Sequence, residues 1–436
     1  MKVALIFDHF GPYHLARARA AADAMEVTCI ELHAKSRSYG WDAGKPARDV
    51  ELVALPETDL RGAAERKWLE SHLARALHEA KPDAVAINGW GDFMSTESLR
   101  WCMRSGVPAI VMSETTAWDE PRKPHREWIK SRMVRMFSAG LAGGTPQREY
   151  LAQLGLPKEV VEIGYDAVDN GHFAERAAEV RKGCAVKSHE SRVASEGEEG
   201  ASYFLASARF IPKKNLGRLI DAYAQYRLAS TERGAGSGEL WDLVLLGDGP
   251  MRGELVQRAL ELGLEVREGA PWESAEGVAG GEWRVASEGT DVGGVLWLAG
   301  FRQIGELPRF YAGAGCFVHA STTEQWGLVV NEAMACGLPV IVSKRCGCAR
   351  DLVQDGVNGF NFDPRDVAQL AALMAKVSAP DFPRADFGEA SRRIVADFGP
   401  ERFAHGLKAA ASHAIGKGAH RPSPLDRLIL NFVCRR

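Results

Sequence analysis

The sequence has no long apolar run and no strong excess of charge. Nowhere in its 436 residues does a stretch approach the ~20 consecutive apolar residues that a membrane-spanning helix needs. The formal net charge of −3 provides no overall field that would attract nucleic acid. The N-terminal run MKVALIFDHF is interrupted by Asp8 and no cleavage site follows it, so it is not a signal peptide. These absences predict a cytoplasmic protein that does not bind nucleic acid.

The eight cysteines are scattered among apolar runs and form no recognisable disulfide or zinc pattern. Such a distribution is typical of reduced thiols in the cytosol. Cys346 and Cys348 flank Gly347, but a zinc site needs about four ligands and no second pair has a suitable spacing. The sequence therefore predicts a tight glycine-containing loop here, and no metal site.

What the sequence does contain is a regular alternation of short apolar runs and helical segments. Val3–Phe7 has the pattern of a buried strand, Tyr13–Met25 that of a helix, and Val27–Leu32 that of a second strand. Together they predict a βαβ unit, which builds a parallel sheet. The alternation continues through the first half of the chain and starts again at Tyr203–Ser207. We therefore expect an α/β protein with at least two domains.

Residues 265–294 interrupt the second α/β region. They are rich in Gly and Glu and lack periodicity. The hexapeptide RVASEG occurs here at 284–289 and also at 192–197, within the charged stretch between the two α/β regions. A short repeat in two segments without secondary-structure signals indicates inserted sequence rather than a repeated fold. We expect surface loops without a catalytic role.

One stretch, residues 319–343, carries most of the chemistry. Ser321–Gln325 is polar and favours turns, a helix is expected from Leu328 to Cys336, and Val340–Val342 is a short buried strand. The start of such a helix has unpaired N–H groups that favour an anion. Glu324 and Glu332, with seven residues between them, offer carboxylates that accept hydrogen bonds from hydroxyl groups. Phosphate and hydroxyl recognition together suit a nucleotide sugar.

The segment EQWGLVVNEAMACGLPVIVS, with its Glu-x7-Glu spacing, resembles the signature of retaining glycosyltransferases of family 4, which have the GT-B fold. GYDAVDNGHF, residues 164–173, resembles the exit from the first domain of that family. The resemblance implies an α/β architecture of two Rossmann-like domains that face each other across a cleft. Its parts are an acceptor domain at 1–173, a linker or insert at 174–201, a donor domain at 202–388, a helix at 389–415 that returns to the first domain, and a tail at 416–436.

The resemblance also assigns roles to individual residues. Arg209 and Lys214, in the loop ARFIPKKNL, are expected to bind the donor diphosphate, since two fixed cations at a strand end suit that group. Glu324 would hold hydroxyls of the transferred sugar and Glu332 the ribose. The remaining expected donor contacts are Gly11, Gly247, Arg302, Gly327, Leu328 and Val329. For Gly11 a plain turn is an equal alternative, and Gly247 belongs to a near-match to a dinucleotide fingerprint whose spacing is one residue too long.

The predicted function is transfer of a sugar from a nucleotide-diphosphate sugar to a glycan, lipid-linked or small-molecule acceptor, with retention. No Asp-x-Asp occurs in the chain, so we expect neither a metal nor a cofactor. The alternatives are a non-catalytic sugar-nucleotide-binding module and an epimerase, hydrolase or phosphorylase of the same fold. Two histidines, His14 and His125, are expected at the surface. For His14, on the first turn of a helix, contact with a ligand is the alternative, and the sequence does not decide the role of His125.

The segment WDEPRKPHREWIKSRMVR, residues 118–135, combines six Lys or Arg residues with three acids and two tryptophans. A basic helix with Trp can lie at a membrane surface. An ordinary helix with its apolar side in the core is the alternative. The first possibility predicts peripheral contact with the inner face of the membrane.

Overall fold

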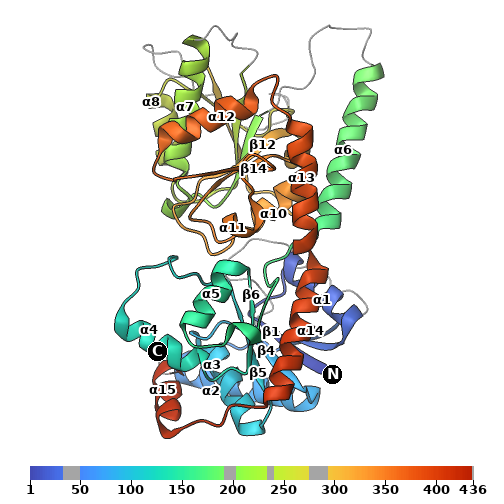
Figure 1. Cartoon of the computed structure of the whole chain (residues 1–436), viewed down its shortest axis with the longest axis vertical. Helices are drawn as coiled ribbons and strands as arrows, with labels where there is room; N and C mark the ends of the chain where they lie inside the picture. The colour runs from blue at the N-terminus through green and yellow to red at the C-terminus, as the bar shows by residue number, and fades with distance from the viewer. Residues whose placement is uncertain (33–49, 191–202, 233–239, 274–292, 435–436) are drawn as a thin grey trace. The chain divides into compact units, whose positions relative to one another are not determined.

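The computed structural model describes residues 1–32, 50–190, 203–232, 240–273 and 293–434 (Figure 1). The chain forms two compact units. Unit 1 comprises Met1–Asp169 and Asp397–Arg436, and unit 2 comprises Asn170–Ala396. Each unit is an α/β domain with its own parallel sheet and its own apolar core.

Unit 1 is built on a sheet of seven parallel strands in the order β3-β2-β1-β4-β5-β6-β7. The strands are β1 (Lys2–Phe7), β2 (Glu26–Glu31), β3 (Glu51–Ala54), β4 (Ala84–Asn88), β5 (Ala109–Ser113), β6 (Ala139–Ala142) and β7 (Val161–Ile163). In the register, Val3 of β1 lies opposite Val27 on one side and Ala84 on the other. The central strands are almost wholly buried, because helices cover both faces of the sheet.

The helices of unit 1 form two layers around this sheet. They are α1 (Pro12–Ala24), α2 (Gly62–Ala80), α3 (Phe93–Ser105), α4 (Pro124–Val134), α5 (Thr145–Gln153), η1 (Lys158–Val160), α14 (Pro400–Lys417) and α15 (Pro424–Cys434), with η4 (Ala396–Phe398) at the boundary between the units. One apolar cluster joins the sheet to α2, α3, α5 and α15, and another joins it to α1 and α14. The C-terminal part of the chain thus completes the core of unit 1.

Unit 2 repeats the same architecture, with the strand order β10-β11-β9-β8-β12-β13-β14. Its strands are β8 (Tyr203–Ser207), β9 (Asp242–Leu246), β10 (Glu265–Glu268), β11 (Val295–Gly300), β12 (Ala314–His319), β13 (Val340–Ser343) and β14 (Gly359–Phe362). The direction in which the chain adds strands reverses between β8 and β12. In open parallel sheets, ligands bind beyond the carboxyl ends of the strands at such a reversal.

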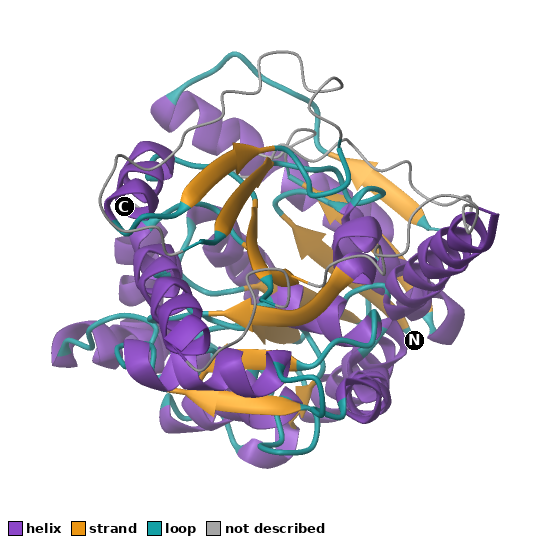
Figure 2. Ribbon diagram, turned by 90° about the horizontal axis from the view of Figure 1, so that it is seen from above, coloured by secondary structure: helices purple, strands orange, loops and turns teal. Residues whose placement is uncertain are grey.

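Helices also flank the strands of unit 2, as in unit 1 (Figures 1 and 2). They are α6 (Asn170–Glu190), η2 (Pro212–Lys214), α7 (Leu216–Glu232), α8 (Arg252–Glu261), α9 (Leu307–Gly313), α10 (Leu328–Ala335), α11 (Ala349–Leu352), α12 (Val367–Ser378) and α13 (Arg384–Val395). Helices α7, α8 and α12 share one apolar cluster with the sheet. Among the described residues, no helix is both long and apolar enough to cross a membrane.

Two predicted segments differ from the structure. The linker predicted at 174–201 is helical up to Glu190, because α6 packs against α9 and α10. Its Arg181 donates hydrogen bonds to the carbonyls of Ala312 (3.1 Å) and Cys336 (2.9 Å). The single helix predicted near the C-terminus is two helices, α13 and α14, since Pro400 starts a new helix at its first position.

The expected insert at 265–294 is partly a regular element. Residues Glu265–Glu268 form β10, which pairs in parallel with β11 at the edge of the sheet. Trp272 packs against Phe310, with ring centroids 4.8 Å apart, and Glu273 forms an ion pair with Arg302 at 3.1 Å. The prediction of an unstructured insert is therefore wrong for its first residues. Residues 274–292 and both RVASEG hexapeptides lie outside the described residues.

We expect that replacing residues 274–292 with a short Gly-Ser linker leaves unit 2 folded, because long surface insertions cost little free energy of loop closure. A linker is needed because β10 and β11 are parallel, so the chain must return to the start of the next strand. The measurement is the unfolding midpoint of the shortened chain. A control that also removes Trp272 and Glu273 should be less stable. Insoluble protein from the first variant would show that the segment belongs to the core.

Candidate functional site

Two loops meet at the carboxyl edge of the unit 2 sheet, at the reversal of strand order. One follows β8 and contains Arg209, Lys213 and Lys214. The other follows β12 and contains Glu324. The backbone N–H of Thr322 donates to the carbonyl of Lys213 at 2.9 Å, which ties the two loops together. The fold thus places charged residues that are more than a hundred positions apart in one site.

The loop after β8 is held in place by its own polar and apolar side chains. Phe210 is buried and anchors the loop in the core. Asn215 adopts a left-handed backbone conformation, with φ of 60°, and ends η2. Its side-chain amide donates to the carbonyls of Ala320 (3.0 Å) and Pro364 (2.7 Å). Asn215 therefore fixes the two lysines relative to the loop after β12.

Gly247 and Gly249, in the turn after β9, support the same loop from the other side. A Cβ atom on Gly247 would lie 2.0 Å from the carbonyl oxygen of Ala208, and one on Gly249 would lie 2.8 Å from the backbone of Phe210. Both glycines also have positive φ angles. Close backbone packing explains why glycine stands at both positions. This role is structural, and the predicted donor contact of Gly247 stays a prediction.

Glu324 is the centre of the site. Its carboxylate is held by the ammonium groups of Lys214, which contacts Oε2, and Lys213, which lies 3.1 Å from Oε1. Ser321 donates to Oε2 at 3.4 Å. The side chain of Lys214 is only 14% exposed, whereas that of Lys213 is 38% exposed. Lys214 is therefore the better shielded of the two cations, and its charge is screened less by water.

The charges of this cluster set the protonation states. Burial alone would raise the pKa of Glu324, but Lys214, His319 and Lys213 outweigh it and hold the pKa at about 2. Burial lowers the pKa of His319 to about 3, and Lys214 adds to the effect. The Nε2 atom of His319 lies 3.8 Å from Oε2 of Glu324. At neutral pH the site thus contains an ionised carboxylate, a neutral imidazole and two ammonium groups.

A third loop, between β13 and α11, holds the backbone around Glu324. The N–H of Glu324 donates to the carbonyl of Arg345 at 3.3 Å, and the N–H of Gly347 donates to the carbonyl of Glu324 at 3.1 Å. Cys346 and Cys348 flank this glycine and are buried free thiols. The predicted tight glycine-containing loop is therefore confirmed. Its hydrogen bonds fix the position of the Glu324 backbone.

Helix α10 starts beside Glu324. Gly327 precedes it with φ of 113°, a conformation that side chains rarely adopt, and Leu328 and Val329 form the first turn. The N–H groups of this turn are those that a helix leaves without internal partners. Glu332, further along α10, is 1% exposed and accepts a hydrogen bond of 2.8 Å from Tyr311. The two glutamates thus differ: Glu324 lies among cations, whereas Glu332 is buried on α10 against Tyr311.

Two predicted cations lie outside the Glu324 cluster. Arg209 comes two residues after β8, and its side chain is exposed. Arg302, after β11, pairs with Glu273 and Glu306 and donates to the carbonyl of Ala299 at 3.0 Å. These contacts occupy the guanidinium of Arg302. The predicted donor contact of Arg302 stays a prediction.

In unit 1, Gly11 precedes α1 with φ of −72°, and a Cβ atom there would meet only His14, at 3.9 Å. Neither the backbone nor the packing requires glycine at this turn. His14 is half-buried rather than at the surface: its ring centroid lies 4.3 Å from that of Phe7 in a tilted arrangement, and burial, Arg17 and His9 lower its pKa to about 3. His125 is exposed on α4, as predicted.

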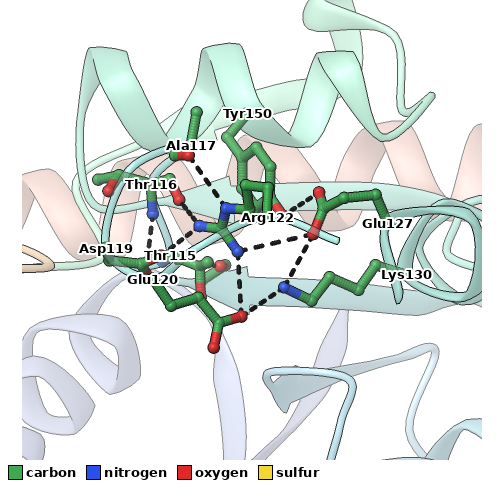
Figure 3. A network of polar contacts seen from close by, with 10 residues as sticks. Thr115, Thr116, Ala117, Asp119, Glu120, Arg122, Glu127, Lys130 and Tyr150 are labelled. Carbon is green, nitrogen blue, oxygen red and sulfur yellow. Dashed lines mark hydrogen bonds and ion pairs between the residues drawn. The ribbon is translucent and has the colours of Figure 1, made fainter. Parts of the chain in front are cut away.

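The segment 118–135 neutralises much of its own charge (Figure 3). Arg122 pairs with Asp119 and Glu120 and lies over the ring of Tyr150, 4.5 Å from its centroid. Lys130 lies 2.6 Å from Glu120 and 3.2 Å from Glu127. The C-terminal end of α4 is part of the core. A network of ion pairs therefore engages Arg122 and Lys130, two of the six basic residues of this segment.

Across the described ranges, no three His, Cys, Asp or Glu side chains are grouped so that they could hold a metal ion. The cluster around Glu324 contains one carboxylate and two ammonium groups. Its chemistry suits an anionic ligand that also carries hydroxyl groups, because the ammonium groups attract phosphate and the carboxylate accepts hydrogen bonds.

Two family models match the chain, one in each unit. The model described as glycosyl transferase 4-like domain matches residues 12–165, and the model described as glycosyl transferases group 1 matches residues 290–394. The chain belongs to the group 1 and 4-like glycosyltransferases. The group 1 match covers Gly327 and both glutamates of the site, and the 4-like match covers most of unit 1.

Curated relatives of the family match shorter stretches. The sulfoquinovosyl transferase of Arabidopsis thaliana is 32% identical over 140 residues, which cover 31% of this chain and 27% of the relative. The D-inositol 3-phosphate glycosyltransferase of Frankia alni is 32% identical over 114 residues, which cover 26% and 28% of the two chains. The match thus spans less than a third of the length of either relative.

Solved structures show that the whole fold is GT-B. The Anabaena HepE structure in complex with UDP has a TM-score of 0.64 at 17% identity, and the match covers 94% of this chain and all of that one. A trehalose-6-phosphate structure from E. coli bound with UDP-2-fluoro glucose has a TM-score of 0.67 at 10% identity, covering 94% and 99%. The predicted fold class is confirmed.

Proposed function

We propose that the chain is a glycosyltransferase that moves a sugar from a nucleotide-diphosphate sugar to an acceptor with retention of configuration. The observation that carries the proposal is the convergence of Lys213, Lys214 and Glu324 where the strand order of the unit 2 sheet reverses. Related structures were obtained with UDP and UDP-2-fluoro glucose, which supports a nucleotide-sugar donor here.

The lysines of the site are suited to stabilise a departing diphosphate. Cleavage of the sugar–phosphate bond leaves negative charge on the phosphate oxygens, and preorganised cations lower the free energy of that transition state. Lys214 is the main cation in this scheme, with Arg209 and the N–H groups of Leu328 and Val329 as further donors. Glu324, ionised because its pKa is about 2, accepts hydrogen bonds from sugar hydroxyls.

The buried Glu332 serves the ribose in this proposal. Its contact with Tyr311 fixes the carboxylate, and a ribose hydroxyl would have to reach it at the edge of α10. The backbone near Arg302 receives the base, and the loop at Gly11 contacts the transferred sugar. The absence of a structural need for glycine at position 11 supports that last role.

The reaction in this proposal uses neither a metal nor a cofactor. The lysines and the helix start supply the positive charge that a metal would otherwise bring to the diphosphate. The acceptor is a glycan, a small molecule or a lipid-linked sugar. Seven buried free cysteines among the described residues support a cytoplasmic location, since reduced thiols are typical of that compartment.

The test is incubation of the purified chain with nucleotide sugars of uridine, guanosine and adenosine and a panel of acceptors. We expect one donor to be consumed, a product with the anomeric configuration of the donor by NMR, and full activity in excess EDTA. An inverted product would contradict retention. Loss of activity in EDTA that manganese restores would contradict the metal-free reaction.

The same assay separates the alternatives. A hydrolase releases free sugar without an acceptor, an epimerase returns a changed donor, and a phosphorylase needs inorganic phosphate. A non-catalytic module binds the donor and consumes none of it. Each of these outcomes would replace sugar transfer as the function of the site.

A further inference from the structure

Helix α15 presents an apolar stripe to solvent. Leu425, Leu428 and Phe432 follow one another at spacings of three and four residues, which places them on one side of the helix. Leu428 is 66% exposed and Phe432 is 46% exposed. The opposite side, with Ile429 and Leu430, packs against α3 and α4. Helix α15 is thus apolar on both sides, and only one of them is covered by unit 1.

The exposed charges of the described chain from residue 421 onward are of one sign. The described part of the chain from residue 421 onward has one carboxylate, Asp426, which is buried and accepts a hydrogen bond from the N–H of Ser423 at 2.9 Å. Asp426 also pairs with Arg132 of α4, at 3.6 Å. Arg421 and Arg427 are exposed, and the sequence continues with Arg435 and Arg436. The exposed charges of this region are therefore positive.

Helix α4 extends this surface. It packs against α15, and Figure 1 shows the two helices side by side at the lower left. Trp128 of α4 is 52% exposed. Lys123, Arg126 and Arg135 are exposed on the same segment, whereas its Arg122 and Lys130 are held in the ion-pair network. We call Trp128, Leu425, Leu428 and Phe432 with these exposed cations the α4–α15 surface.

We propose that the α4–α15 surface binds an anionic lipid bilayer, with α15 lying in the plane of the interface. A helix with an apolar stripe and flanking arginines binds at the boundary between headgroups and acyl chains, because apolar burial and attraction to anionic lipid act together. Tryptophan is enriched at the same depth. The absence of an exposed carboxylate on the described residues of α15 favours an anionic bilayer over an apolar protein groove.

The proposed membrane contact therefore lies mainly on α15 and not at the centre of segment 118–135. Most of the binding energy comes from α15, and α4 adds Trp128 and cations. A contact of this kind would hold the enzyme next to a lipid-linked acceptor. The surface and its test do not depend on the transfer reaction, so either proposal can fail while the other stands.

The experiment is co-sedimentation of the full chain with vesicles of phosphatidylcholine alone and of phosphatidylcholine mixed with phosphatidylglycerol. We expect the wild type to sediment with the mixed vesicles at low salt and to be released as salt screens the arginines. Replacing Leu428 and Phe432 together with serine should weaken binding at least ~10-fold, because apolar burial supplies part of the affinity. Arg421→Glu with Arg427→Glu should abolish the preference for anionic vesicles.

Leu228→Ser is the matched control, because Leu228 is a 48% exposed leucine on a helix of unit 2. It should sediment like the wild type. Far-ultraviolet circular dichroism and the unfolding midpoint check that the α15 variants are folded, as expected for exposed positions. No sedimentation of the wild type at low salt overturns the proposal. A dimer in analytical ultracentrifugation that Leu428→Ser dissociates, without vesicle binding, assigns the surface to a second copy of the chain and also overturns it.

Discussion

Replacing Lys214 with alanine is expected to lower kcat for sugar transfer by roughly a hundredfold to a thousandfold, the loss typical of removing one preorganised donor to developing negative charge. Lys214 is the more buried of the two ammonium groups on Glu324, so its field is screened least. The variant also removes a cation from the Glu324 carboxylate, which then repels the diphosphate. The measurement is steady-state kinetics with the donor found by screening, together with the unfolding midpoint.

Lys213→Ala is the matched control for this variant. It removes a neighbouring ammonium group from the same carboxylate, but one that is more exposed. We expect kcat to fall less than ~10-fold, since an exposed ion pair contributes little free energy. Arg209→Ala should lower kcat for sugar transfer more than ~10-fold if the guanidinium of Arg209 contacts the diphosphate. Wild-type rates for Lys214→Ala would show that the diphosphate lies elsewhere. Equal losses of kcat for the two variants would contradict the assignment of Lys214 as the main cation.

Substitutions of the two glutamates should affect different quantities, namely kcat for Glu324 and donor affinity for Glu332. Glu324→Gln keeps the shape of the side chain and removes its charge, so we expect kcat to fall at least ~10-fold while donor affinity changes little. Glu332→Gln should weaken donor binding by about 10-fold or more with a smaller effect on kcat, because it removes a charged acceptor for a ribose hydroxyl. Isothermal titration with the donor and steady-state kinetics separate the two effects. Unchanged donor affinity and turnover in both variants would refute the assignment.

The pH dependence of stability provides a second readout for Glu324. Its pKa falls from 4.5 to about 2 in the folded state, so the folded protein binds fewer protons than the unfolded chain in this range. The carboxylate therefore stabilises the fold above pH 4.5, and that contribution is lost as the pH falls towards 2. We expect the difference in unfolding free energy between wild type and Glu324→Gln to be constant near neutral pH and to shrink in acid. A constant difference down to pH 3 would mean that Glu324 is not held by cations.

The sequence predicts the parts of this site that depend on local pattern. The run from Glu324 to Ser343 contains the loop, the glycine that starts α10 and the buried strand β13, and all three occur where expected. The alternation of apolar runs and helices likewise predicts two parallel sheets. Local signals suffice here because turn chemistry and periodicity are set by neighbouring residues.

Other parts depend on contacts between distant segments, which no local pattern reports. Lys213 looks like a solvated neighbour of Lys214 until the fold places it 3.1 Å from Glu324. Asn215 and His319 act through residues far away in the sequence: the side-chain amide of Asn215 donates to the carbonyl of Ala320, and Lys214 helps to lower the pKa of His319. Of these residues, only Asn215 could be recognised from the sequence, because Asn tolerates the left-handed backbone conformation that ends η2. Helix α6 and strand β10 were missed because tertiary packing, rather than strong periodicity, stabilises them.

The most direct test of the central claim is isothermal titration of the wild type and of Lys214→Ala with UDP, GDP and ADP. The account predicts that one of these nucleoside diphosphates binds the wild type and that Lys214→Ala weakens this binding at least ~10-fold, because a charged contact to phosphate is worth more than a neutral hydrogen bond. Binding that is equally strong in the variant, or no binding of any of the three to the wild type, would contradict a diphosphate site between the loops that follow β8 and β12.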